Sequence, residues 1–258
     1  MAHKARRRFG QNFLTDENLQ HVLVQSLNLR AGDLLLEIGP GRGALTRLMV
    51  KLLPRFKAIE IDRDLVPRLR QEFPGVEVIE SDVLKYDFSS LLNSVDNKWR
   101  IVGNLPYNIS TPLLDLLLAH AECIQDMHFM LQKEVVDRLC AHPDTKNWGR
   151  LGIMMQYLCD IEKLVDVPPS SFTPAPKVNS AFVRLSPKIE PLKLSDRALF
   201  KKVLRTAFNQ RRKTLRNALA IYLVELPEST VDRNARPENL SVADYVAFSN
   251  ELSAAGIT

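Results

Sequence analysis

The sequence predicts an α/β fold, in which a mostly parallel, Rossmann-like sheet is closed by an antiparallel hairpin and followed by a small all-α C-terminal domain. From residue 33 onward, short runs rich in β-formers alternate with segments in which apolar residues recur at helical spacing, as in stacked βα units. The alternating character of residues 178–185 indicates the closing hairpin. Beyond residue 195 the pattern is helical, without a further strand signal.

The first βα unit is the clearest. Residues 34–38 predict a buried strand, residues 39–43 a glycine turn, and residues 44–53 a helix that ends before Pro54. Further strands are expected at residues 56–61, 76–80, 100–103, 127–131 and 162–167. Further helices are expected at residues 64–72, 111–120 and 133–141.

A proline-containing stretch around Pro187 and Pro191 predicts a domain boundary. Residues 1–187 are expected to form the main domain, with residues 1–14 as a basic arm and lid, and residues 188–258 the small helical domain. A chain of 258 residues with 45% hydrophobic content can bury one full core and still supply such an appendage.

The charge balance favours a polyanionic partner, because 35 basic side chains face 30 acidic ones and give a net charge of +5. The basic first ten residues are not followed by an apolar run, so a secretory signal is not expected and a cytoplasmic location is. No run of 18 apolar residues occurs, so no membrane span is expected.

The cysteines Cys123, Cys140 and Cys159 lack any C-x-x-C pairing, which fits reduced thiols in the core. Their spacing to the histidines matches no zinc pattern, so we expect no metal.

A nucleoside pocket is predicted at the glycine turn. Glycines at positions 39, 41 and 43, between a strand and a helix, let the backbone approach a ligand closely. Glu60 ends the second strand about 20 residues on, where a carboxylate can accept hydrogen bonds from ribose hydroxyls. Asp82 follows the third strand and could bind the adenine amine of the same ligand. For Asp82 the alternative is a helix N-cap.

A second motif, Asn104-Leu105-Pro106-Tyr107, follows the fourth strand. Its residues meet at the carboxyl edge of the sheet, where ligands bind. The Asn104 side-chain oxygen and the Leu105 carbonyl could accept both hydrogens of an adenine N6 amine, with Tyr107 stacking on the base. The alternatives are a turn residue before proline for Asn104 and a core ring for Tyr107. Phe172, on a proline-rich loop, is expected either to cover a flipped adenine or to anchor the loop.

Several segments together resemble the KsgA/RsmA ribosomal RNA adenine dimethyltransferases: residues 8–14, 37–46, 104–112, 127–134 and 208–217. The resemblance implies a class I methyltransferase in which residues 1–187 bind S-adenosylmethionine, leaving S-adenosylhomocysteine as product. It implies dimethylation of two neighbouring adenosines in a hairpin near the 3′ end of small-subunit ribosomal RNA, on an assembling 30S particle, without an obligatory protein subunit. The cofactor-binding positions implied are Gln11, Asn12, Leu14, Gly39, Gly41, Glu60, Ile61, Asp82, Val83 and Asn104.

The C-terminal region predicts an RNA-binding face. Residues 197–216 contain basic side chains and no acidic one, whereas a merely solubilising helix mixes both signs of charge. Such a face binds phosphates without reading sequence. The candidate contacts are Arg205, Arg211, Arg212, Lys213 and Arg216.

Three other functions stay open from the residues. A nicotinamide enzyme is disfavoured because the G-x-G-x-G spacing differs from G-x-G-x-x-G. An Erm-type methyltransferase performs the same N6 chemistry on large-subunit RNA and differs in the helical tail. A ribosome-assembly or transcription factor without catalysis would not need the N6 acceptors of the Asn104 motif.

Overall fold

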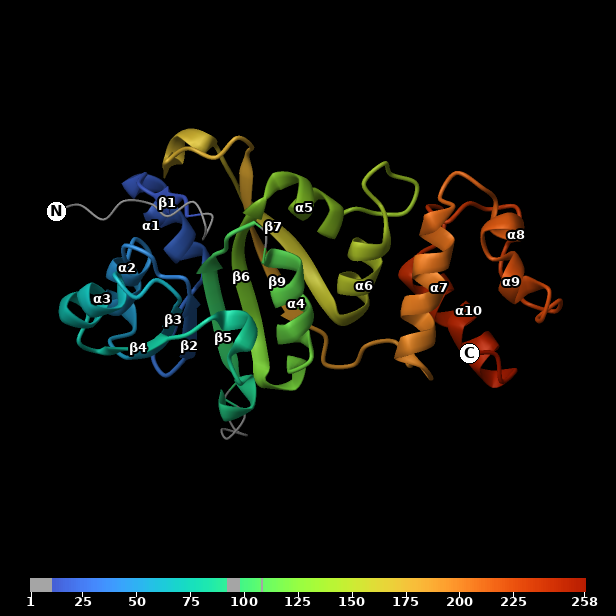
Figure 1. Cartoon of the computed structure of the whole chain (residues 1–258), viewed down its shortest axis with the longest axis horizontal. Helices are drawn as coiled ribbons and strands as arrows, with labels where there is room; N and C mark the ends of the chain where they lie inside the picture. The colour runs from blue at the N-terminus through green and yellow to red at the C-terminus, as the bar shows by residue number, and fades with distance from the viewer. Residues whose placement is uncertain (1–10, 92–97, 108) are drawn as a thin grey trace. The chain divides into compact units, whose positions relative to one another are not determined.

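The chain divides into two compact units. The computed structural model describes residues 11–91, 98–107 and 109–258 (Figure 1). The first unit comprises Met1–Val136 and Ile161–Pro187, and the second comprises Asp137–Asp160 and Lys188–Thr258. One of the crossings between them lies at Pro187, near the boundary expected from the sequence. Residues 137–160, however, group with the C-terminal part of the chain rather than with residues 1–187.

The first unit is built on a seven-stranded sheet in the order β4-β3-β2-β5-β6-β9-β7. The strands are β2 (Leu34–Ile38), β3 (Phe56–Glu60), β4 (Val76–Glu80), β5 (Trp99–Asn104), β6 (Ile124–Gln132), β7 (Cys159–Val167) and β9 (Ser180–Pro187). Strands β4 through β6 pair in parallel, and β9 pairs antiparallel to β6. The predicted mostly parallel sheet with an antiparallel closing strand is confirmed.

The strand order reverses next to β2. The chain runs outward from β2 to β3 and β4 and then returns to place β5 on the other side of β2. Ile38, the last residue of β2, pairs with Gly103, so Asn104 lies beside the glycine turn at the carboxyl edge of the sheet. This reversal point is where open α/β sheets bind ligands.

The helices of the first unit are α1 (Glu17–Ser26), α2 (Thr46–Leu52), α3 (Val66–Glu72) and α4 (Ser110–Leu118), and α5 (Lys133–Leu139) begins in the first unit and ends in the second. Short 3₁₀ helices occupy Val83–Lys85, Phe88–Leu91, Ala121–Cys123 and Pro169–Ser171. Asp16 starts α1 by accepting a hydrogen bond from the Leu19 amide, at 3.0 Å. Pro67 stands in the first turn of α3, where its missing N–H costs nothing.

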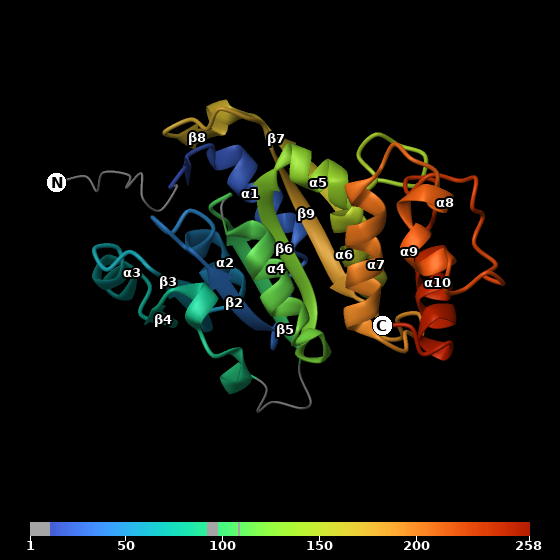
Figure 2. The ribbon, with the colours of Figure 1, turned by 45° about the vertical axis from the view of Figure 1, so that its right-hand side comes forward.

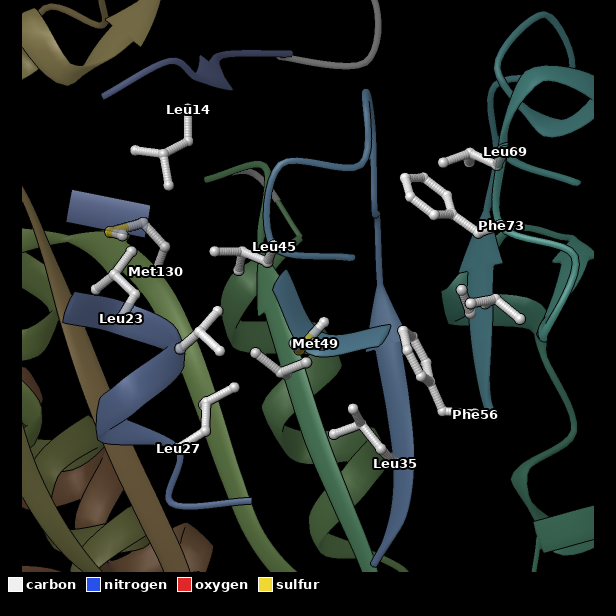
Figure 3. Packing of buried hydrophobic residues seen from close by; sticks show 14 of the residues in the cluster. Leu14, Leu23, Leu27, Leu35, Leu45, Met49, Phe56, Leu69, Phe73 and Met130 are labelled. Carbon is white, nitrogen blue, oxygen red and sulfur yellow. The ribbon is translucent and has the colours of Figure 1, made fainter. Parts of the chain in front are cut away.

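Helices α1, α2 and α3 cover one face of the sheet with a continuous apolar cluster. Figure 3 shows Leu23 of α1, Leu27 directly after α1 and Met49 of α2 directed toward this face, with α4 on the opposite face. The side chains of Leu23 and Met49 are fully buried. Burying such side chains stabilises the fold by about 1.5–3 kcal/mol each, so this packing holds the carboxyl edge in place.

A small second sheet was not expected from the sequence. Strand β1 (Phe13–Leu14) pairs antiparallel with β8 (Phe172–Thr173), and Figure 2 shows the two segments close together. The Thr15 amide extends the pairing by donating to the Ser171 carbonyl, at 2.8 Å. A segment near the start of the chain is thereby fixed to the loop between β7 and β9.

A buried ionic network stabilises the amino-terminal end of β5. The Arg100 guanidinium pairs with Asp126, at 2.8 Å, and with Asp33, at 2.9 Å. It also donates to the Leu27 and Asn28 carbonyls that follow α1. Because every partner is an acceptor, the guanidinium is paired with both charge and hydrogen bonds, which a buried cation requires.

The second unit is all-helical apart from the first residues of β7, as predicted for the C-terminal domain. Its helices are α6 (Arg150–Leu158), α7 (Arg197–Asn209), α8 (Leu215–Ala218), α9 (Ala220–Leu223) and α10 (Val242–Ala254). A reciprocal capping box between Ser241 and Asp244 starts α10. The fully buried Tyr245 of α10 donates its hydroxyl to the Pro237 carbonyl, at 2.8 Å. In the described part of the chain, none of the helices combines the length and apolarity needed to cross a bilayer.

Candidate active site

A cavity of about 370 Å³ opens at the carboxyl edge of β2, β3, β4 and β5. Its volume lies in the range of small-molecule sites. Every position expected to contact the cofactor lines it: Gln11, Asn12, Leu14, Gly39, Gly41, Glu60, Ile61, Asp82, Val83 and Asn104. The motif residues Leu105 and Tyr107 line it as well. Segments separated by up to 90 or so residues in the sequence therefore line the same cavity, because parallel strands end at one edge of the sheet.

The glycine turn needs its glycines for backbone conformation. Gly39, Gly41 and Gly43 all have positive φ, at 68°, 57° and 76°. A Cβ at Gly41 would come within 3.2 Å of the Phe13 ring, which packs over the turn. The Gly39 amide donates to the Ile59 carbonyl, at 2.8 Å, which ties the turn to the end of β3. The backbone is thus exposed to the cavity without side chains in the way.

Glu60 is a buried carboxylate held in place by main-chain donors. Its oxygens accept hydrogen bonds from the Gly41 amide, at 3.0 Å, and from the Asp62 amide, at 2.9 Å. Burial raises the pKa of Glu60, and these amide hydrogen bonds oppose that rise. Each carboxylate oxygen can accept a further bond, so Glu60 has the capacity to bind a pair of hydroxyls in the cavity.

Asp62 is a site residue that the sequence analysis did not identify. Its side chain is fully buried and accepts a hydrogen bond from the Gln11 side-chain amide, at 3.0 Å. Its own backbone amide binds Glu60. Asp62 therefore connects the segment preceding β1 with the carboxylate at the end of β3. Its position two residues after Glu60 was the only signal that could have pointed to it.

Glu37 directly precedes Ile38 and the glycine turn, and the sequence analysis assigned it no role of its own within the segment 37–46. Its carboxyl group is 2% exposed and accepts the Thr46 hydroxyl, at 2.7 Å. Burial raises the pKa of Glu37 to about 8, with a further contribution from the neighbouring charge of Glu60. The carboxyl group therefore holds its proton at neutral pH and can donate as well as accept hydrogen bonds.

Asp82 combines the two interpretations considered for it. Its carboxylate accepts the Leu84 amide, at 3.1 Å, and so caps the 3₁₀ helix at Val83–Lys85. The same residue lines the cavity, as do Ile61 and Val83. Capping fixes the position of the carboxylate at the cavity wall, so the two roles are compatible.

Asn104 carries the most informative hydrogen bond of the cavity. Its side-chain amide donates to the Asn12 carbonyl, at 3.0 Å. Because only the NH₂ group can donate to a carbonyl, this contact determines which side of the amide is oxygen. Among the described residues Asn104 makes no other side-chain hydrogen bond, so its oxygen is left as an acceptor at the cavity.

Leu105 and Tyr107 complete this corner of the cavity. The buried Leu105 is anchored through its amide to the Met130 carbonyl of β6, at 3.3 Å. The Tyr107 hydroxyl shares a hydrogen bond with the Ser180 hydroxyl of β9, at 2.7 Å. Fixing the hydroxyl orients the half-buried ring at the cavity, where its face could stack on a planar ligand. The motif position Asn108 lies outside the described residues.

Phe172 is placed differently from the expectation that it covers an adenine. The side chain is 4% exposed, belongs to the apolar cluster that contains Phe13 and Leu14, and is not among the cavity-lining residues. Its backbone pairs with Leu14 in the β1/β8 sheet. This placement matches the alternative interpretation, in which Phe172 anchors the loop.

The basic residues of the second unit differ among themselves. Arg211 forms an ion pair with Glu238, at 2.6 Å, and also donates to the Thr145 carbonyl, so it has a role within the unit. Of the other predicted contacts, Arg205, Arg212, Lys213 and Arg216 are exposed and form no ion pair with a described residue. These four predicted contacts are accessible to a polyanion. The N-terminal basic arm at residues 1–10, including Arg6, Arg7 and Arg8, lies outside the described residues.

The fold and the motifs have close counterparts among known proteins. A family model described as "Ribosomal RNA adenine dimethylase" matches residues 2–254. "Ribosomal RNA small subunit methyltransferase A" from Marinobacter nauticus is 50% identical over 260 residues, covering 98% of this chain and 94% of that protein. The protein of the same name from Pseudomonas aeruginosa is 50% identical over 258 residues, covering 97% and 96%.

Solved structures agree with this assignment. A dimethyladenosine transferase from Plasmodium falciparum superposes with a TM-score of 0.79 at 25% identity, covering 95% of this chain and 98% of that one. The 23S rRNA methyltransferase ErmE superposes with a TM-score of 0.69 at 26% identity, covering 94% and 100%. With a family match along nearly the whole chain and half of the residues identical in named relatives, the chain belongs to the ribosomal RNA adenine dimethylase family.

Proposed function

We propose that this enzyme transfers methyl groups from S-adenosylmethionine to the N6 amines of two adjacent adenosines. The substrate is a hairpin near the 3′ end of small-subunit ribosomal RNA in assembling 30S particles, in the cytoplasm. Membership of the family supports adenine dimethylation in ribosomal RNA. The small-subunit methyltransferase names of relatives that are 50% identical favour the small-subunit substrate.

The residues of the cavity suit S-adenosylmethionine chemically. Glu60 would accept the ribose hydroxyls, Asp82 the adenine amine, and the backbone at Gly39 would approach the methionine part. Gln11, Asn12 and Leu14 would cover the ligand from the β1 side, next to Gly41, Ile61 and Val83. When bound, S-adenosylmethionine supplies a methyl group activated by a positively charged sulfur. No metal is included in this proposal.

The Asn104–Asn12 hydrogen bond carries the catalytic proposal. Adenine N6 is a poor nucleophile because its lone pair is delocalised into the ring. With its NH₂ group donating to the Asn12 carbonyl, Asn104 has its side-chain oxygen available and would accept one N6 hydrogen. The Leu105 carbonyl would accept the other, and Tyr107 would stack on the base. These contacts draw the amine toward tetrahedral geometry and aim its lone pair at the methyl group.

This arrangement requires no strong base. The methylated amine becomes acidic enough to lose its proton to water. The carboxylate of Glu60, held by the Gly41 and Asp62 amides, is proposed to bind the ligand rather than to transfer a proton. Catalysis then arises from positioning the reacting atoms in line. In a second round, with a new S-adenosylmethionine bound, the monomethylated amine has one hydrogen left, which one of the two acceptors would hold while the second methyl group is transferred.

An Erm-type activity on large-subunit RNA is the nearest alternative, since ErmE shares the fold at 26% identity. The test is to incubate the enzyme and labelled S-adenosylmethionine with unmodified small and large ribosomal subunits separately, and to digest the RNA to nucleosides. We expect N6,N6-dimethyladenosine from the small subunit alone. Label in the large subunit would favour the Erm-type activity, and label in neither would favour a binding protein without catalysis.

The exposed cations Arg205, Arg212, Lys213 and Arg216 are proposed to contact phosphates of the RNA. Arg211 is assigned instead to holding the second unit together through Glu238. No obligatory protein subunit is part of this proposal.

A further inference from the structure

A second cavity, of about 210 Å³, lies next to the glycine turn that also lines the cofactor cavity. The two cavities share Gly41 and Arg42 and no other lining residue. The second one is enclosed by the turn, α2 and α3, all within the first unit. Its apolar lining comes from Leu65 and Leu69, which are 2% and 3% exposed. The family's proposed chemistry uses only the first cavity.

Three arginines line this second cavity, together with a single carboxylate. Arg42 comes from the turn, Arg47 from α2 and Arg68 from α3, whereas Glu72 is the only acidic residue in the lining among the residues that the structure describes. Three elements therefore each place one arginine at the same small cavity. An excess of positive charge concentrated in this way attracts anions, and a guanidinium group matches the paired oxygens of a phosphate.

The one carboxylate does not neutralise the site. Glu72 pairs with Arg47, at 2.6 Å, but the side chains of this pair are 49% and 53% exposed. An ion pair in that environment contributes little net stability, so an incoming phosphate can replace Glu72 at low cost. Arg68 is exposed and forms no ion pair with any described residue.

Arg42 connects the second cavity to the segment that covers the first one. Its guanidinium lies 4.3 Å from the centre of the Phe13 ring in β1. The neighbouring Gly41 donates its amide to Glu60 in the cofactor cavity. A group bound by Arg42 would therefore sit next to both the covering strand and the turn that positions the cofactor.

We propose that this second cavity, here called the arginine cavity, binds a phosphodiester of the substrate RNA on the catalytic unit. The identification of the ligand as RNA rests on the proposed function, because an enzyme that modifies RNA meets phosphodiesters at high local concentration. The apolar lining of Leu65 and Leu69 suits a sugar ring beside the phosphate. Free phosphate is the other source of the same chemistry, and the experiment separates the two.

Arg68 is the residue to change, because it is exposed and contacts neither the cofactor cavity nor β1. Arg68→Glu reverses the charge, and Arg68→Gln removes it with less disturbance of α3. The matched control is Arg55→Glu, an exposed arginine without an ion pair among the described residues. Arg55 immediately precedes β3, and Glu60 ends it at the carboxyl edge of the sheet. The control therefore lies at the amino edge, away from the glycine turn.

The measurement is equilibrium binding to unmodified small ribosomal subunits over a range of KCl concentrations. We expect Arg68→Glu to weaken binding on the order of three- to ten-fold at low salt. The slope of log affinity against log salt should decrease by about one, with a smaller loss for Arg68→Gln. Arg55→Glu should differ little from the wild type. In methyl transfer, KM for the subunit should rise while kcat and S-adenosylmethionine affinity stay unchanged.

Equal binding by Arg68→Glu and Arg55→Glu, in proteins with unchanged melting temperatures, would overturn the site. So would a second outcome, in which inorganic phosphate at constant ionic strength stabilises wild type but not Arg68→Glu while RNA affinity stays equal, since that identifies free phosphate as the ligand. Binding needs no methyl transfer. A wild-type enzyme that fails to form dimethyladenosine would therefore refute the proposed function without removing an Arg68-dependent loss of RNA affinity.

Discussion

The side-chain amide of Asn104 donates to the main-chain carbonyl of Asn12, at 3.0 Å and 92 residues apart in the sequence. Asn12 immediately precedes β1, and the two residues of β1 pair with strand β8 in the loop before β9. The orientation of the proposed catalytic amide therefore depends on the segment that covers the cofactor cavity. The covering segment and the catalytic motif form one structural assembly.

Replacing Asn104 by Ala should lower kcat for methyl transfer by about 10²–10³-fold, because it removes an acceptor used chiefly in the transition state. Binding of S-adenosylmethionine, followed by calorimetry, should weaken far less than kcat falls, although the hydrogen bond to Asn12 is lost, and binding of small subunits should change little. Single-turnover transfer with saturating ligands is the direct measurement. A turnover equal to that of the wild type would contradict the role assigned to the Asn104 oxygen.

Asp62→Asn tests the connection between Gln11 and the end of β3. The change keeps the size of the side chain but offers an NH₂ group where a carboxylate oxygen now accepts the Gln11 amide. We expect cofactor affinity to fall on the order of ten-fold, since one hydrogen bond to a charged group is lost and a donor faces a donor. Asp115→Asn makes the same change at an exposed residue of α4 outside the cavity lining and serves as the control for general effects of substitution.

Glu37→Gln tests the protonated carboxyl group under the glycine turn. The pKa of Glu37 is about 8 in the folded protein against 4.5 for the free group. Between these values the unfolded chain releases the proton and the folded chain retains it, so stability falls as pH rises through this window. Denaturant unfolding of the ligand-free protein from about pH 5 to about pH 9 should show that decline in the wild type and a flatter profile in Glu37→Gln.

His128 provides an independent signal in the same titration. Burial lowers its pKa to about 4 from 6.5. As pH falls, the His128 imidazole is protonated in the unfolded chain before it is protonated in the folded chain. The free energy of unfolding therefore decreases as pH falls below 6.5 toward 4. Because both proteins contain His128, the difference between wild type and Glu37→Gln cancels its contribution. A difference that stays constant with pH would exclude a raised pKa at Glu37.

Arg100→Met should lower the free energy of unfolding by about 3–5 kcal/mol, because it leaves the buried carboxylate of Asp126 without its cation. The double variant Arg100→Met with Asp126→Leu removes both charges and should recover part of the loss. Urea unfolding of the ligand-free protein gives both values. Equal stability of the single and double variants would show that the two charges do not depend on one another.

Arg212→Glu and Arg216→Glu should each weaken subunit binding and lower its salt slope by about one. The control is Lys193→Glu, which precedes α7, whereas Arg212 and Arg216 follow its end. Arg211→Glu is a different experiment, since it breaks the pair with Glu238 and should lower the melting temperature of the protein. Salt slopes equal to that of Lys193→Glu would remove these positions from the RNA contact surface.

Much of the architecture could be predicted from the hydrophobic pattern of the sequence and from the rules of parallel sheet topology. The strand at Leu34–Ile38 occurs where its apolar run and the following glycines indicated it. Because parallel strands end at one edge, Glu60, Asp82 and Asn104 were expected to meet, and they line one cavity. Their assignment to the cofactor stays a prediction.

Other features depend on tertiary contacts that no local pattern encodes. Strand β1 has two residues, and its partner lies on the loop before β9, so neither segment has a periodic signal of its own. The assignment of residues 137–160 to the second unit follows from packing of α6 with α7 and α10. The different roles of Arg211 and Arg212 follow from the ion pair of Arg211 with Glu238, which is 27 residues away in the sequence and gives no local signal.

The pairing of β1 with β8 also constrains protein engineering. Lengthening the loop that contains Phe172 by one residue would shift its partner Leu14 and turn the neighbouring Phe13 away from Gly41 and Arg42, because a one-residue slip exchanges the two faces of a strand. Chimeras with a transplanted catalytic unit therefore need residues 11–16 and 168–179 from the same parent.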